Sequence, residues 1–215
     1  RKRGSKQAWE IDCLINAEED DPAVLMSLLD QVTDAAGKSG AMKIFLRLPV
    51  GSMAVQDASR CGFAAYRGEQ VWRCGRAPSP VRKADTELRR RAKPDQHPLF
   101  QLYNALVPEQ LRRYEGMTMT EWTATQESLG KTAQYVIERD SRIGGLLRLA
   151  GDGDIGRFDV LGGGAVLDDL IDGALAKLAN RGTLIAIVPA YQEDAARRLA
   201  ERGFEPADEF VVMAR

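Results

Sequence analysis

One segment of this chain occurs twice, and the repeat limits the folds that the chain can adopt. Residues 23–30 read AVLMSLLD and residues 165–172 read AVLDDLID, at a constant offset of 142 positions. A Gly-Phe pair at 62–63 recurs at 203–204, each time after a similar apolar run. The sequence therefore predicts two copies of one structural unit, the second organised around the helix that begins near Ala165.

The composition is that of a globular protein with a core, since 44% of the 215 residues are apolar and 28% are charged. The formal net charge of −1 provides no field that would attract nucleic acid. No apolar run approaches the roughly 20 residues that span a bilayer, and no signal-peptide core opens the chain. We expect a cytoplasmic protein that binds neither nucleic acid nor membrane.

The three cysteines, Cys13, Cys61 and Cys74, are an odd number without a C-x-x-C spacing or a neighbouring histidine. This pattern favours neither a disulfide framework nor a zinc site. We expect reduced thiols in or beside the core, and no metal. The basic clusters at 1–3 and 89–91 are short, and we expect both on the solvated surface.

The first part of the chain alternates strands and helices. Residues 8–17 alternate apolar and acidic positions, as a half-buried strand does, and Pro22 opens a helix that ends at 37–40. A strand at 43–50, a short helix at 51–60 and a strand at 64–74 follow. The prolines and charges of 76–93 predict a linker that leads into a short exposed helix.

The second part adds elements before the same series. We expect helices around Leu99 and after Pro108, with helix and loop both open for the residues from Glu121. A hairpin turns at 140–142, and a further strand covers 155–161. The organising helix, an apolar strand at 183–188 buried on both faces, a helix at 192–202 and a strand at 209–214 complete the chain.

This order predicts an α/β protein, more closely an α+β mixed sheet with helices on both faces. We divide the chain into a partial copy at 1–75, a linker at 76–94 and a complete copy at 95–215. The partial copy holds only the last five elements of the complete one.

The element order and the ending at 197–215, which reads RRLAERGFEPADEFVVMAR, resemble the GNAT (N-acetyltransferase) superfamily. Members of that family close with a helix, a Gly-Phe pair and a final strand. The resemblance implies an acyl-CoA N-acyltransferase fold in a tandem repeat whose first copy is truncated. It also implies acyl transfer from acetyl-CoA to an amine, carried by a small molecule or a protein.

In that family the cofactor lies between two diverging central strands, and its pyrophosphate rests on the first N–H groups of the following helix. Those groups have no partner within the helix and carry partial positive charge. The resemblance places the cofactor site of the second copy on the loop and helix start at 160–166 and on the residue that opens the next helix. These residues are Val160, Leu161, Gly162, Gly163, Gly164, Ala165, Val166 and Gln192.

The chain departs from the family in several places. The family loop carries Arg or Gln followed by Gly-x-Gly or Gly-x-Ala, but the aligned positions here hold Gly162, Ala165 and Leu167. Asp168 and Asp169 lie in the first helical turn, where they favour the helix and oppose a bound anion. In the first copy, Glu18, Glu19, Asp20 and Asp21 crowd the equivalent position.

No catalytic residue can be assigned from the sequence. The family often has a Tyr in the penultimate helix that protonates the departing thiolate, but the aligned positions here are Leu199 and Ala58, with Tyr191 nearby. Glu138 and Asp159 are the titratable strand residues that a general base would require. His97, the only histidine, is expected as a capping or surface residue, and Trp122 as a packing anchor.

Three hypotheses follow. The chain is an N-acyltransferase whose second copy holds acetyl-CoA, or it is a degenerate GNAT-fold module that binds a ligand or partner without catalysis. In the third, the two halves pair their sheets and the arrangement has only a structural role.

Overall fold

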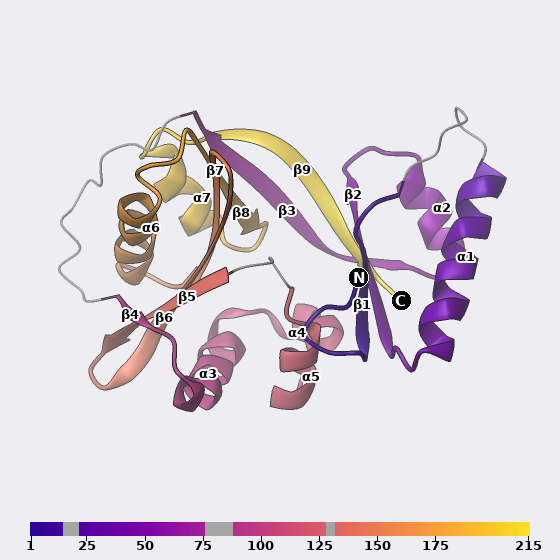
Figure 1. Ribbon diagram of the computed structural model, residues 1–215, viewed down its shortest axis with the longest axis horizontal. Helices are drawn as coiled ribbons and strands as arrows, with labels where there is room; N and C mark the ends of the chain where they lie inside the picture. The colour runs from indigo at the N-terminus through magenta and orange to yellow at the C-terminus, as the bar shows by residue number, and fades with distance from the viewer. Residues whose placement is uncertain (15–21, 76–87, 128–131) are drawn as a thin grey trace. The chain divides into compact units, whose positions relative to one another are not determined.

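The computed structural model describes residues 1–14, 22–75, 88–127 and 132–215 (Figure 1). The chain forms two compact units, each assembled from separate stretches of sequence. Unit 1 contains Arg1–Gly68, Gln110–Ser128 and Glu209–Arg215. Unit 2 contains Glu69–Glu109 and Leu129–Asp208.

Unit 1 is a sheet with helices, and residues 64–68 of strand β3 (Ala64–Cys74) also belong to it. Its strands follow the order β1 (Ala8–Ile11), β2 (Lys43–Pro49) and β9 (Glu205–Ala214), with β1 parallel and β9 antiparallel to β2. The helices are α1 (Pro22–Lys38), α2 (Ala54–Arg60), α4 (Glu109–Glu115) and α5 (Met119–Thr125).

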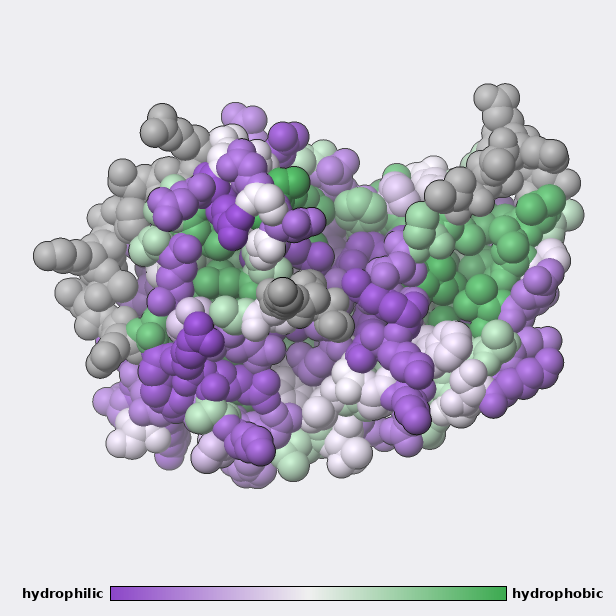
Figure 2. All heavy atoms as spheres, viewed as in Figure 1, coloured by the Kyte–Doolittle hydropathy of each residue, from purple (hydrophilic) through white to green (hydrophobic). Residues whose placement is uncertain are grey.

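Strand β2 separates the two apolar clusters of unit 1 because its successive side chains point to opposite faces. Ile44, Leu46 and Leu48 pack with α1 and α2, whereas Phe45 packs with Ala8 and Ala214 on the other face. Apolar side chains remain exposed over α1, α2 and the turns beside β2, where Figure 2 shows a hydrophobic region. The large exposed side chains there are Val24, Leu28, Met42, Val50 and Met53.

Unit 2 contains a six-stranded mixed sheet with the strand order β3-β8-β7-β6-β5-β4. Its strands are β3 (Ala64–Cys74, from Glu69 onward), β4 (Arg89–Arg90), β5 (Thr132–Arg139), β6 (Arg142–Asp152), β7 (Ile155–Gly162) and β8 (Thr183–Pro189). Its helices are the 3-10 helix η1 (Lys93–Asp95), α3 (Gln96–Leu106), α6 (Val166–Lys177) and α7 (Glu193–Ala200).

The core of unit 2 lies between the sheet and α6. The helix contributes Leu167, Leu170, Ile171, Ala174 and Leu175, all at most 2% exposed, so the apolar stripe predicted from the sequence is confirmed. On the sheet side this cluster includes Ile137 and Leu147, and α7 adds Ala195 and Leu199. Val136 and Leu146, at alternate positions of their strands, are buried outside this cluster, and α3 contacts β6 and β7.

The closing strand of each predicted copy pairs within the unit of the other copy. The second half of β3 pairs with β8 of the second copy, from Glu69↔Pro189 to Cys74↔Leu184. Correspondingly, β9 from the end of the chain pairs with β2 of the first copy, from Phe45↔Ala214 to Pro49↔Phe210. Neither unit therefore contains a complete copy. The division of the sequence into a partial copy at 1–75, a linker at 76–94 and a complete copy at 95–215 stays a prediction.

Most predicted elements are present, with a few corrections. The hairpin turn is confirmed, since Asp140 and Ser141 both have positive φ. Residues 119–125 are helical, which settles the choice between helix and loop, and Trp122 is buried as predicted. The first strand ends at Ile11, and the predicted positions 15–17 lie outside the described residues.

Four predictions about burial are wrong. The basic cluster at 1–3 is not wholly solvated, because Arg3 is 8% exposed and pairs with Glu10. Strand β8 is not buried on both faces, because only Leu184, Ala186 and Val188 face the α6 core while the alternate residues stay partly exposed. Cys13 is exposed, whereas Cys61 is buried and Cys74 is half-buried. Arg91 is half-buried rather than solvated, because 89–90 form strand β4 inside the predicted linker; residues 76–87 of that linker lie outside the described residues.

Helix α6 approaches the sheet closely because Gly145 and Gly162 face each other beneath it. A Cβ atom on Gly145 would lie 2.7 Å from Cγ1 of Val166 and 2.9 Å from Cδ1 of Leu170. On Gly162 it would lie 2.9 Å from the same Leu170 atom. The absence of a side chain at Gly145 therefore serves the close packing of α6 on the sheet.

Gly145→Ala should lower the free energy of unfolding by about 1–3 kcal/mol, because the added methyl group overpacks the contact with α6. Gly144→Ala is the matched control, since its Cβ would lie 3.6 Å from Val166 Cγ2, an ordinary contact. We expect the control to change stability by less than about 0.5 kcal/mol. Urea unfolding measures both, and equal losses would contradict the close packing.

Candidate functional site

Strands β7 and β8 pair only along their first halves. Their parallel register runs from Ile155↔Thr183 to Phe158↔Ala186 and ends there. Beyond that point β7 stays paired with β6 as far as Gly145↔Gly162, while β8 stays paired with β3 as far as Glu69↔Pro189. The structure describes residues 159–162 of β7 and 187–189 of β8, and these two segments therefore do not pair with each other.

The loop from β7 to α6 presents several unpaired backbone donors beside this opening. The N–H groups of Gly163, Gly164, Ala165 and Val166 form no hydrogen bond with any residue that the structure describes. Gly164 has φ of +57°, which favours glycine, and a Cβ there would meet nothing within 4 Å. Together with the partial positive charge of a helix N-terminus, these donors suit a bound anion.

The three loop glycines have different roles. Gly162 belongs to β7 and lets Leu170 approach the sheet, so its lack of a side chain serves packing. Gly163 and Gly164 follow the strand and form the open part of the loop, with Leu106 of α3 near Gly163. Within the predicted cofactor loop, the unpaired N–H groups therefore belong to Gly163, Gly164, Ala165 and Val166 and not to Gly162.

The carboxylates in the first turn of α6 are paired with arginines. Asp168 lies 3.2 Å from Nε of Arg198 and accepts a 3.0 Å hydrogen bond from Nη2 of Arg202. Asp169 pairs with Arg139 of β5. Their negative charge, expected to oppose a bound anion, is thus largely compensated locally.

Arg198 also reaches the loop itself, since its Nη2 donates a 3.1 Å hydrogen bond to the carbonyl oxygen of Gly164. Arg202 is anchored by Asp172, with Nε 2.7 Å from Oδ1, and both side chains are almost fully buried. The ion pair between Arg202 and Asp172 joins α6 to the residues that follow α7, and it holds the guanidinium of Arg202 near Asp168. Sequence reasoning missed these arginines, although Asp168/Asp172 and Arg198/Arg202 share the i,i+4 spacing of two facing helices.

The remaining predicted cofactor residues lie at different depths. Val160 is 8% exposed and belongs to the α6 core, whereas Leu161 is half-buried on the opposite face of β7. Gln192 precedes α7, and its Nε2 donates a 3.5 Å hydrogen bond to the hydroxyl of Tyr191. The Oε1 atom of Gln192 is buried without a hydrogen-bond partner, so this side chain has an acceptor left over for a ligand.

The candidate acids and bases are occupied elsewhere. Leu199 and Ala58 are core residues, and neither side chain can donate a proton. Glu138 pairs with Arg89, and Asp159 pairs with Arg148 at 2.7 Å. His97 is exposed in the first turn of α3, as expected of a surface residue. The acidic run at 18–21 lies outside the described residues.

Within the described ranges, no three His, Cys, Asp or Glu side chains gather in a way that could hold a metal ion. None of the helices described there is both long and apolar enough to cross a membrane.

Solved structures share the fold of this chain. A functionally unknown conserved protein from Staphylococcus epidermidis ATCC 12228 matches with a TM-score of 0.63 and 11% identity, over 91% of this chain and 81% of that one. A tandem GNAT protein from the clavulanic acid biosynthesis pathway matches with a TM-score of 0.55 and 14% identity, over 96% and 74%. The chain has the GNAT acyltransferase fold.

A GCN5-related N-acetyltransferase from Anabaena variabilis ATCC 29413 gives a TM-score of 0.53 and 12% identity, over 90% of this chain but only 50% of that one. The sequence matches no protein-family model and none of the curated proteins. At these identities the likeness extends to the GNAT fold and not to a substrate.

Asp168 makes stability depend on pH. Partial burial raises its pKa, but the hydrogen bonds and charges of Arg202 and Arg198 outweigh this, so the pKa lies below the ordinary value. The stabilisation is present above the unfolded pKa of about 3.9 and disappears as pH falls through the lower folded pKa. Asp168→Asn should therefore lower stability at pH 7, and its difference from the wild type should shrink as pH falls below about 4.

Urea unfolding at pH 7 and pH 3 measures this effect. Asp152→Asn, at an exposed position at the end of β6, serves as the control and should behave as the wild type. A stability difference for Asp168→Asn that stayed constant between pH 7 and pH 3 would contradict the assigned ion pairs.

Proposed function

We propose that this chain is a GNAT-type N-acyltransferase that binds acetyl-CoA in unit 2. The observation that carries the proposal is the end of β7–β8 pairing beside four unpaired N–H groups at 163–166. Acetyl-CoA bound to a GNAT fold needs both features, because the pantetheine arm lies between the diverging strands and the pyrophosphate lies at the helix N-terminus. When bound, acetyl-CoA would supply an acyl group activated as a thioester.

The residues of this chain would hold the cofactor in three ways. Gly163, Gly164, Ala165 and Val166 would donate backbone hydrogen bonds to phosphate oxygens. The free edges of β7 and β8 would pair with the amides of the arm. Gln192, with its unpartnered buried Oε1, would accept a hydrogen bond from the same arm.

The acceptor would be an amine on a small molecule or a protein, and the protein would work in the cytoplasm. With a core leucine at the place of the family tyrosine, proton transfer to the thiolate would come from solvent or from the Tyr191 hydroxyl. A tandem arrangement with a truncated first copy is part of the same proposal, supported by the match to a tandem GNAT protein.

A second candidate is a degenerate GNAT-fold module that binds a ligand or partner without catalysis. It is favoured by one observation, namely that a core leucine occupies the place of the family tyrosine while Glu138 and Asp159 are engaged in ion pairs. This candidate shares the fold but predicts no acyl transfer.

Calorimetric titration with acetyl-CoA and with desulfo-CoA tests the proposal. The wild type should bind both at one site, because the pyrophosphate contacts do not require the thioester. Gly163→Glu should weaken binding by about tenfold or more, or ~1.4 kcal/mol, because a carboxylate would face the pyrophosphate.

Gly163→Gln is the matched control, since it adds nearly the same volume beside Leu106 without a charge. We expect it to retain affinity within a few fold. Absence of binding by the folded wild type would overturn cofactor binding. Binding without acetylation of any amine tested would favour the module.

A further inference from the structure

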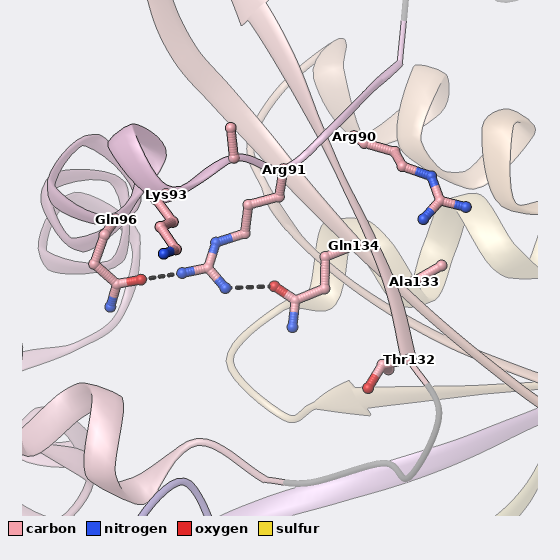
Figure 3. Close-up of a pocket in the computed structure, with 8 residues that line it drawn as sticks. Arg90, Arg91, Lys93, Gln96, Thr132, Ala133 and Gln134 are labelled. Atoms are coloured by element: carbon pink, nitrogen blue, oxygen red, sulfur yellow. Dashed lines mark hydrogen bonds between the residues drawn. The ribbon is translucent and has the colours of Figure 1, made fainter.

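A second concave site lies in unit 2 at β4, η1, the start of α3 and the start of β5 (Figure 3). Its volume is about 550 Å³, within the range of small-molecule sites. Its lining residues include three cations and no acidic side chain: Arg90, Arg91, Ala92, Lys93, Gln96, Thr132, Ala133 and Gln134.

The local backbone fixes these residues firmly. Strand β4 pairs with β5 through Arg89↔Val136 and Arg90↔Tyr135, and the N–H of Arg91 continues the ladder with a 3.0 Å hydrogen bond to the Gln134 carbonyl. The chain then turns into η1, where the Asp95 carboxylate accepts a 2.7 Å hydrogen bond from the N–H of Ala92. The direction of the Arg91 side chain is thereby set by strand pairing.

The nearby carboxylates are engaged by Arg89. Asp95, 6% exposed, accepts two hydrogen bonds of 2.7 and 2.8 Å from the Arg89 guanidinium, which also pairs with Glu138. These contacts hold the pKa of Asp95 below its usual value, so its charge is committed to Arg89. It contributes only a weaker, longer-range attraction to Arg91.

Arg91 itself is held by neutral groups. Its Nη1 donates a 2.7 Å hydrogen bond to Oε1 of Gln134, and its Nη2 donates to Oε1 of Gln96. Its Nε is buried without a hydrogen-bond partner, and no carboxylate of the described residues forms an ion pair with it. Burial lowers the pKa of Arg91, with Asp95 opposing the shift, which reflects a cation that lacks a direct counter-charge.

Figure 3 shows how the side chains are disposed. Arg91 lies between Gln96 and Gln134 with Lys93 beside it, whereas Arg90 points away from them. The guanidinium carbon of Arg90 instead lies 5.8 Å from the ring centre of Tyr135. Two cations, Arg91 and Lys93, therefore converge on the site.

We propose that this pocket binds the oxyanion group of a small molecule, a phosphate or a carboxylate, between Arg91 and Lys93. A guanidinium has five N–H donors, of which the two glutamines use two, and an ammonium has three. A half-buried arginine without an ion-pair partner gains from a charged acceptor, because the local dielectric is lower than that of water.

This site is distinct from the proposed cofactor loop. Gln134 and Thr132 lie at the start of β5, where Thr132 pairs with Ala150, while Gly162 pairs with Gly145 beside Ile137 at the other end of the strands. Ile137 lies five positions after Thr132 along the strand, a distance of roughly 16 Å. Binding here can therefore succeed or fail independently of acetyl-CoA.

The test is titration of the full chain with inorganic phosphate, pyrophosphate and succinate, followed by calorimetry at low ionic strength. We expect saturable binding of at least one anion, and the stronger of the phosphate and succinate responses identifies the ligand class. Lys93→Met, at an exposed position, should weaken binding by about fivefold or more, and Arg91→Met by more.

Lys38→Met is the matched control because it makes the same substitution at an exposed lysine that does not line the pocket. Binding to this variant should stay within twofold of the wild type, and binding should persist in Gly163→Glu, where the cofactor loop is blocked. Absence of binding by any anion, or equal weakening by Lys38→Met and Lys93→Met, would overturn the proposal.

Discussion

The exchange of closing strands is the constraint on which the rest of the structure depends. Strand β2 of the first copy has β9 of the second copy as its antiparallel neighbour, and β8 of the second copy has β3 of the first. Each copy therefore receives the closing strand of the other. An open edge on β8 would expose a row of unpaired backbone groups. Strand β3 pairs with β8 as far as Glu69↔Pro189, which is three residues beyond the end of β7–β8 pairing at Ala186.

The candidate site follows from that arrangement and from the packing of α6. Gly145 and Gly162 allow Val166 and Leu170 to approach the sheet, which sets the start of α6 at the end of β7. The ion pair between Arg202 and Asp172 joins α6 to the residues that follow α7, and Arg198 donates a hydrogen bond to the Gly164 carbonyl oxygen. Packing and ion pairs thus hold the loop so that its N–H groups stay available.

The sequence predicted elements with a strong local signal and missed those that depend on partners. Periodicity found α1, α6 and the β5–β6 hairpin, and the element order with the ending at 197–215 indicated the GNAT fold. It could not predict the strand exchange, because β3 and β9 would pair equally well by pattern in either unit. The short β4 has no signal of its own, so Arg91 was assigned to the surface, and the compensation of Asp168 required knowing that α7 packs beside α6.

Amide chemical shifts of the labelled protein during titration with acetyl-CoA test the cofactor site most directly. The account predicts saturable shifts for Gly163, Gly164, Ala165 and Val166, with smaller shifts along the free edges of β7 and β8. Amides around Arg91 and Gln134 should respond to inorganic phosphate instead. Shifts confined to other surfaces, or no shifts at saturating acetyl-CoA, would contradict a cofactor site at the start of α6.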